Sequence, residues 1–218
     1  MNRSRQLGFT LWELLMTLLV AGILLGIGVP NVMEFQRNGA MTANANDVIT
    51  AMLMARSEAV KRQAPVTWCL TADPLAATPA CSLGPVMNST TSGFIVWADD
   101  NDNGVADATD GNFVVDAGEQ ILTRATAPNA PIRVSTNCGN IAFLPTGFPR
   151  PTTAGAPCNP PERALLFCDD RGRRVAAGSL STARVVLTNR VGRAQVLSET
   201  GPVNTWATAL AAGGADCP

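Results

Sequence analysis

A long apolar segment near the N-terminus restricts what this chain can fold into. Residues 9–29 contain one charged side chain, Glu13. As a helix rising about 1.5 Å per residue, this segment spans about 30 Å, the thickness of the hydrocarbon core of a membrane. Arg3 and Arg5 precede it, which favours a cytoplasmic N-terminus. The sequence therefore predicts a membrane-spanning helix over residues 9–30, with the rest of the chain beyond the membrane.

A cleaved secretory signal explains this segment less well. Its apolar stretch is longer than that of a usual signal peptide, and no small-residue cleavage site leads into a soluble start. Residues 35–64 also continue with helical periodicity. An ordinary, unprocessed signal anchor is the remaining alternative.

The acid inside the apolar segment indicates a function, because a carboxylate in lipid is costly. The residues around it, Gly8 to Leu15 (GFTLWELL), closely resemble the class III signal of type IV pilins and type II secretion pseudopilins. The resemblance implies that prepilin peptidase cuts between Gly8 and Phe9, that Phe9 becomes N-methylphenylalanine, and that residues 1–8 are a leader peptide. It also implies that Glu13 pairs with the N-terminal amine of a neighbouring subunit. Phe9 and Glu13 stand four residues apart, on one helix face, which suits that role.

Two glycines and a proline lie near the end of the apolar segment. Pro30 cannot donate a backbone hydrogen bond and disfavours the helical state of the residue before it. Together with Gly26 and Gly28, it predicts a break in the helix. The break is either a kink near the membrane interface or, as the family resemblance implies, a segment that unwinds when subunits pack into a filament.

Residues 31–64 are predicted to continue the helix as an amphipathic segment. Pro65 is expected to end it near Gln63, and Glu58 and Arg62 form an i, i+4 ion pair of the favourable orientation. Apolar side chains recur at i, i+3 or i+4 spacing. They are Met41, Ala45, Val48, Met52, Ala55 and Ala59.

Beyond Pro65 the pattern changes to short β-rich runs separated by Gly, Pro, Asn and Asp. Residues 73–92 and 145–161 are expected to be loops. The sequence therefore predicts an α+β fold, in which a long N-terminal helix packs on an antiparallel β head over residues 65–218. The predicted strands are 66–70, 94–97, 120–123, 132–135, 141–144, 164–168, 183–188 and 194–197.

Two short sequence motifs after the membrane segment resemble those of the GspH/FimT family of minor pilins and pseudopilins. They are residues 55–62 (ARSEAVKR) and 66–69 (VTWC), and weaker likeness returns at 167–168, 183–187 and 191–193. The resemblance implies the pilin fold and a minor type IV pilin that primes pilus assembly at or near the tip. The alternatives are a minor pseudopilin of type II secretion and a DNA-binding pilin for natural transformation.

The resemblance also implies a location and a set of partners. The precursor is expected to cross the bacterial inner membrane once, with its head in the periplasm, and then to enter the pilus at the cell surface. Its expected partners are other minor pilins, the major pilin, prepilin peptidase and the inner-membrane assembly platform.

Composition argues against an enzyme. The chain has no His and no Tyr, so Ser-His-Asp triads, Cys-His dyads and His metal ligands are excluded. The six cysteines include no C-x-x-C pair, so structural disulfides in an oxidising compartment are favoured over zinc or redox chemistry. Many pairings are open. Short or end-anchoring loops favour Cys69–Cys81, Cys138–Cys158 and Cys168–Cys217.

An acidic segment over residues 99–119 is a candidate calcium site. Its oxygen-bearing side chains follow the order of a calcium-binding loop, with an aspartate in place of the usual last glutamate. They are Asp99, Asn101, Asn103, Asp107 and Asp110. A strand precedes the loop where an EF-hand requires a helix, so a hairpin turn rich in Asp and Asn is the alternative. No other cofactor is predicted.

A basic region near the C-terminus is a candidate DNA site. Some GspH/FimT relatives used in natural transformation bind DNA through a Gly-Arg-x-Arg element, which here reads Gly192-Arg193-Ala194-Gln195. One cation of the motif is missing, which weakens binding to phosphates. Arg174 and Arg190 are candidates to replace it. A solvated, partly salt-bridged surface is the alternative.

Overall fold

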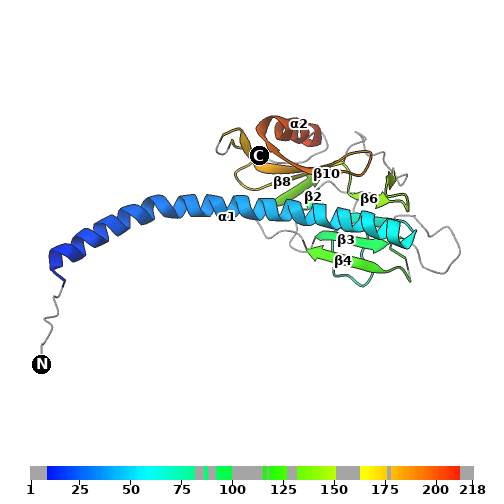
Figure 1. Cartoon of the computed structure of the whole chain (residues 1–218), viewed down its shortest axis with the longest axis horizontal. Helices are drawn as coiled ribbons and strands as arrows, with labels where there is room; N and C mark the ends of the chain where they lie inside the picture. Colours follow the sequence, from blue (N-terminus) through cyan, green and yellow to red (C-terminus); the bar gives the residue numbers. More distant parts are fainter. Residues whose placement is uncertain are drawn as a thin grey trace, which may run out of the picture. The chain divides into compact units, whose positions relative to one another are not determined.

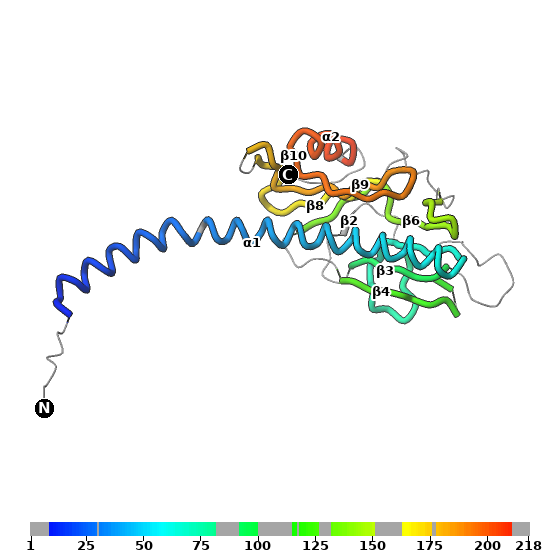
Figure 2. The backbone as a smooth tube through the Cα atoms, viewed as in Figure 1, coloured from blue at the N-terminus to red at the C-terminus, as the bar shows by residue number. Residues whose placement is uncertain are grey.

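The computed structural model describes residues 9–81, 86–87, 92–99, 115–116, 118–126, 132–150, 163–175 and 178–211. The chain forms two compact units, Met1–Ala40 and Met41–Pro218. Its elements, shown in Figure 1 and as a backbone tube in Figure 2, follow one another as α1 (Leu11–Arg62), β1 (Val66–Thr71), β2 (Val86–Met87), β3 (Gly93–Ala98), β4 (Ile121–Thr126), β5 (Arg133–Thr136), β6 (Asn140–Phe143), β7 (Pro149–Arg150), β8 (Arg163–Cys168), β9 (Leu180–Thr188), β10 (Ala194–Glu199) and α2 (Thr200–Ala211).

The first unit contains the N-terminal part of α1, and its large apolar side chains face outward. Leu15, Leu19, Ile23 and Ile27 are each 50% exposed or more. By length and composition α1 can cross a membrane, and in the part of the chain that is described it is the one helix that meets this test. So many exposed apolar side chains on one helix require lipid or another protein around them.

The helix continues through the predicted break. α1 is continuous over Gly26, Gly28 and Pro30, so the helix does not end there, and a bend at these residues stays a prediction. After the proline, the Asn31 side chain donates a hydrogen bond to the carbonyl oxygen of Ile27, four residues earlier, at 3.1 Å. Unwinding of this segment on packing into a filament concerns the assembled state and stays a prediction.

The second unit has two antiparallel five-stranded sheets around the C-terminal part of α1. Strand order is β4-β3-β1-β6-β7 in the first sheet and β10-β9-β8-β5-β2 in the second. Figure 1 shows α1 running between them. The main core joins the helix to the inner faces of both sheets, including Trp68 and Phe94 of the first and Leu165 and Phe167 of the second.

The predicted apolar stripe of α1 is confirmed as the face that enters this core. All six of its residues are buried, and the alanines are fully so. The small side chains of the alanines bring the helix close to both sheets. Met41 and Met52 fill the space between the alanines. The predicted pair is also present, with Glu58 Oε2 accepting from Arg62 Nε at 2.9 Å.

The end of α1 follows the prediction as well. Gln63 has a φ of 55°, the left-handed conformation that closes many helices, and Pro65 follows two residues later. β1 then begins at once.

All eight predicted strands are present, with shifted ends, but three elements were missed. β2 and β7 fall in stretches expected to be loops, and each has two residues, too few for an alternating pattern. The helix α2 was missed because Gly201-Pro202 indicates a turn. A proline in the first turn of a helix is nevertheless tolerated, because the backbone N–H that it lacks has no partner there.

α2 covers the outer face of the second sheet. Val203, Ala207 and Leu210 of α2 form a second core cluster with side chains of β8 and β9 such as Leu166 and Val185. The second sheet is therefore buried on both faces, which explains why β8 is a continuous run of buried residues without polar alternation.

We expect Met52→Ala to lower the free energy of unfolding by about 2–5 kcal/mol, because it leaves a cavity between the sheets and removes the sulfur that accepts a hydrogen bond from Thr188 Oγ1. The matched control is Leu53→Ala, the next residue of the same helix, which is 51% exposed and is expected to cost about 0.5 kcal/mol or less. Urea denaturation of the full chain in detergent, followed by tryptophan fluorescence, measures both. Equal losses would contradict this account of the core.

Candidate functional site

The start of α1 is a capping box built from Thr10 and Glu13. The Thr10 backbone N–H and hydroxyl both donate to Glu13 Oε2 at 3.1 Å, and the Glu13 backbone N–H donates to Thr10 Oγ1 at 3.3 Å. Two backbone donors that a helix start leaves without partners are thereby satisfied. The carboxylate predicted to act in assembly is thus held at a defined position by its own helix.

Thr10 is a residue that the sequence reasoning missed. Its signal was present, since Thr10-x-x-Glu13 is the capping-box pattern directly before an apolar helix. Phe9 precedes Thr10 and is 82% exposed, while Gly8 lies outside the described residues. Cleavage between Gly8 and Phe9 would place the new amine next to the residue that holds the carboxylate.

One of the three predicted disulfides lies within the described residues and is confirmed. Cys69 of β1 bonds to Cys81, with their Cα atoms 5.7 Å apart. Cys138 and Cys168 are each disulfide-bonded as well. Their predicted partners, Cys158 and Cys217, lie outside the described residues, so these two pairings stay predictions.

The candidate calcium loop lies mostly outside the described residues. Of its five residues only Asp99 is described, and its side chain is buried. Asp99 Oδ2 accepts a hydrogen bond from Thr67 Oγ1 at 3.1 Å, and its backbone N–H donates to Pro65 at 2.9 Å. Among the residues that the structure describes, no group of three or more acids and cysteines is placed to hold a metal ion. The observed role of Asp99 is to join β1 to the end of β3.

The three candidate DNA-binding arginines do not form one cluster. Arg190 and Arg193 are exposed in the turn between β9 and β10. The Arg174 carbonyl accepts from the Thr182 backbone N–H at 2.9 Å, near the other end of β9. Thr182 and Thr188 stand about 20 Å apart along this strand at about 3.3 Å per residue. Arg174 therefore cannot replace the cation missing beside Arg193, whereas Arg190 shares its turn.

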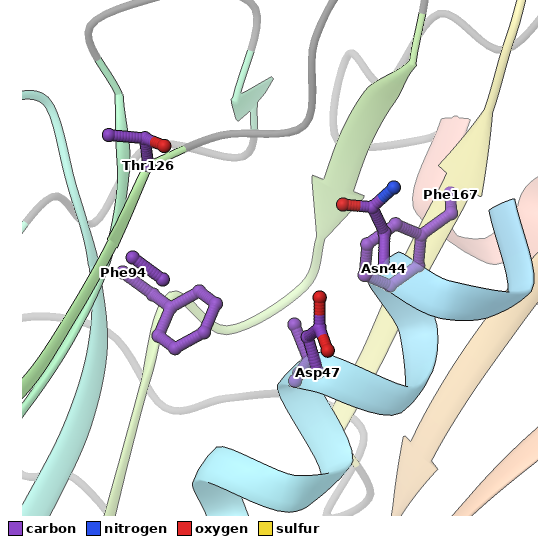
Figure 3. Close-up of a pocket in the computed structure, with 7 residues that line it drawn as sticks. Asn44, Asp47, Phe94, Thr126 and Phe167 are labelled. Atoms are coloured by element: carbon purple, nitrogen blue, oxygen red, sulfur yellow. The ribbon is translucent and has the colours of Figure 1, made fainter. Parts of the chain in front are cut away.

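A small cavity lies between α1 and the two sheets, and Figure 3 shows Phe94 and Phe167 on either side of it with the Asp47 carboxylate between them. Asn44 of α1 and Thr126 of β4 also line it. Its volume of about 40 Å³ has room for a few water molecules, far below the several hundred Å³ of a usual small-molecule site. This cavity is thus no candidate ligand site.

Three carboxyl groups meet where the acidic segment returns to the first sheet. The Asp116 backbone N–H donates to Glu119 Oε2 at 2.7 Å. Burial, together with the nearby charges of Asp99 and Asp116 and a hydrogen bond to Asp99, raises the pKa of Glu119 to about 7. Glu119 consequently holds a proton in the folded chain at a pH where an ordinary glutamate has lost it.

We expect the head to lose stability as pH rises from about 4.5 to about 7, the range between the ordinary pKa of glutamate and that of Glu119. Across it the folded state keeps a proton that the unfolded state has released, so the free energy of unfolding falls. Glu119→Gln should melt at a higher temperature than the unsubstituted chain above pH 7 and match it near pH 4.5. Thermal melts across this range test the effect, with Glu199→Gln, at an exposed position of β10, as the control. A pH dependence unchanged by Glu119→Gln would rule it out.

Three comparisons relate the chain to known proteins. No curated protein matches the chain. Two crystal forms of the type IV minor pilin FimU of Pseudomonas aeruginosa (strain PAO1) are similar at 15% identity. One has a TM-score of 0.43 and covers 77% of this chain and 94% of FimU. The other has a TM-score of 0.36 and covers 72% and 91%. The family model described as Type II transport protein GspH matches residues 44–192. Since this match spans more than half of the chain, the chain belongs to the GspH family of minor pilins and pseudopilins.

Proposed function

We propose that this protein is a minor type IV pilin that primes pilus assembly at or near the tip and catalyses no reaction. Prepilin peptidase cleaves it between Gly8 and Phe9, and Phe9 is methylated. Residues 9–30 cross the inner membrane, residues 31–64 continue the helix, and the head over 65–218 lies in the periplasm before it enters the pilus. The observation that carries the proposal is the exposed apolar start of α1 with one carboxylate, Glu13, held at its first turn.

The geometry of this carboxylate suits an incoming amine. Both hydrogen bonds from Thr10 go to Oε2 of Glu13, and Oε1 accepts none from the residues that the structure describes. The carboxylate is therefore oriented yet keeps an oxygen for the N-terminal amine of a neighbouring subunit, whether minor or major pilin. An unpaired carboxylate is costly both in lipid and inside a packed filament. Pairing of Glu13 with the amine therefore favours the position of the subunit in which the two groups meet.

A minor pseudopilin of type II secretion is the second candidate, because the matching family model is described as a type II transport protein. Both functions require processing by prepilin peptidase and assembly at an inner-membrane platform. Deletion of the gene separates them, since loss of pili supports the first and loss of protein secretion with intact pili supports the second.

The mature protein should begin at Phe9. Mass spectrometry of the protein purified from its own host is expected to find an N-terminal peptide that starts with N-methylphenylalanine and lacks residues 1–8. A first residue at any other position would exclude the class III processing on which the proposal rests.

Glu13→Ala should leave cleavage intact but remove the protein from sheared filaments, because the neighbouring amine then lacks its counter-charge. Thr10→Ala should reduce incorporation about fivefold, since loss of a helix cap costs about 1 kcal/mol. The matched control is Thr17→Ala, at an exposed helical position where the hydroxyl donates to the Leu14 carbonyl. Quantitative immunoblots of filament and membrane fractions measure all three, and Glu13→Ala at normal filament levels would refute the pairing.

A further inference from the structure

Two glycine turns from different sheets meet beside α1. Gly147 lies in the β6–β7 turn and Gly192 in the β9–β10 turn, both with φ of 78°. A Cβ atom on Gly147 would lie 3.2 Å from Val60 Cγ2 of α1, and one on Gly192 would lie 3.1 Å from Phe143 and 3.6 Å from the Gly147 carbonyl oxygen. Other residues are disfavoured at both positions by the positive φ and the close neighbours. The two turns and the helix therefore present one continuous surface.

This turn surface combines exposed apolar side chains with arginines. Its apolar members are 45–52% exposed. Its cations, from α1 and the β9–β10 turn, make no side-chain hydrogen bond or ion pair with any residue in the described ranges. By contrast, the nearby Glu58 on α1 is already bonded to Lys61 and Arg62. The surface consists of Val60, Phe148 and Val191 with Arg56, Arg190 and Arg193.

Hydrogen bonds hold both turns in place before any partner arrives. The Asn189 side-chain oxygen accepts from the backbone N–H groups of Val191 and Arg193, at 3.1 and 2.9 Å. In the other turn, the Gly147 N–H donates to the Leu144 carbonyl at 2.7 Å, and the Leu144 N–H donates to Phe148 at 2.9 Å. Little backbone freedom remains to be lost on binding, which favours affinity.

We infer that the turn surface docks onto the head of another pilin subunit, at a place that presents carboxylates around an apolar contact. This inference rests on the proposed function, which surrounds the chain with other pilins. Arginines that lose water on docking require new acceptors, and carboxylates match the guanidinium group in charge and geometry. Aromatic side chains and arginines are also among the residue types enriched at protein interfaces.

Apolar content favours a protein partner over DNA. Three of the six side chains are aliphatic or aromatic, and a phosphate backbone offers them no counterpart. Affinity for DNA also rises with the number of cations that reach phosphates, and this surface has three, while Arg174 lies at the far end of β9. Docking onto another subunit uses both the apolar side chains and the arginines of the surface.

Site-specific photo-crosslinking in the host tests the inference. The full-length chain carries p-benzoylphenylalanine in place of Phe148, or in place of Val175, which is 62% exposed and follows Arg174. We expect the probe at position 148, and not that at 175, to cross-link to another pilin through a peptide that contains Asp or Glu. Arg193→Glu should lower the cross-link about tenfold or more, and the matched Arg174→Glu, also at an exposed position, should leave it unchanged.

The outcomes separate this inference from the proposed function. Correct processing at Phe9 with no pilin cross-link from position 148, or with one that Arg193→Glu leaves intact, overturns the docking surface alone. A chain that is not processed at Phe9 overturns the proposed function. Binding of duplex DNA that Arg193→Glu abolishes, together with no pilin cross-link, assigns the surface to nucleic acid and overturns the inference. Equal melting temperatures of the two charge variants establish that both are folded.

Discussion

The packing of small side chains along α1 between two sheets is the contact on which the head depends. Ala45, Ala55 and Ala59 are fully buried, so the helix backbone approaches both sheets at once. Either sheet without the helix would expose an inner face that includes Trp68 or Phe167. Since hydrophobic burial is the main favourable term in folding, the helix joins the two sheets into one core.

The same helix serves two environments because its pattern changes along its length. Up to residue 40 its large apolar side chains are exposed all round, which suits lipid or a bundle of similar helices. From Met41 the buried apolar side chains lie on one face, and charges such as Glu58 lie outside it. α1 is continuous through Pro30, so one helix includes both parts.

Charges in the described part of the chain fall into two groups that differ in their partners. Glu58 is bonded within its own helix, and Asp99 is bonded across the sheet to Thr67. The arginines of the turn surface have no such partners in the described ranges. Charges of the first group stabilise the subunit, whereas the second group remains for another molecule.

Sequence alone determined the elements whose signals are local. Those signals are the 3.6-residue period of α1, the apolar β runs that became strands, and the short spacing between Cys69 and Cys81. Tertiary structure alone decided which distant residues meet. It joined the turns of Gly147 and Gly192, separated Arg174 from Arg193, and laid α2 over the second sheet. The physical reason is that strand order in both sheets departs from chain order, with β1 between β3 and β6 and β5 between β8 and β2. Those neighbours are set by long-range burial, which no local pattern encodes.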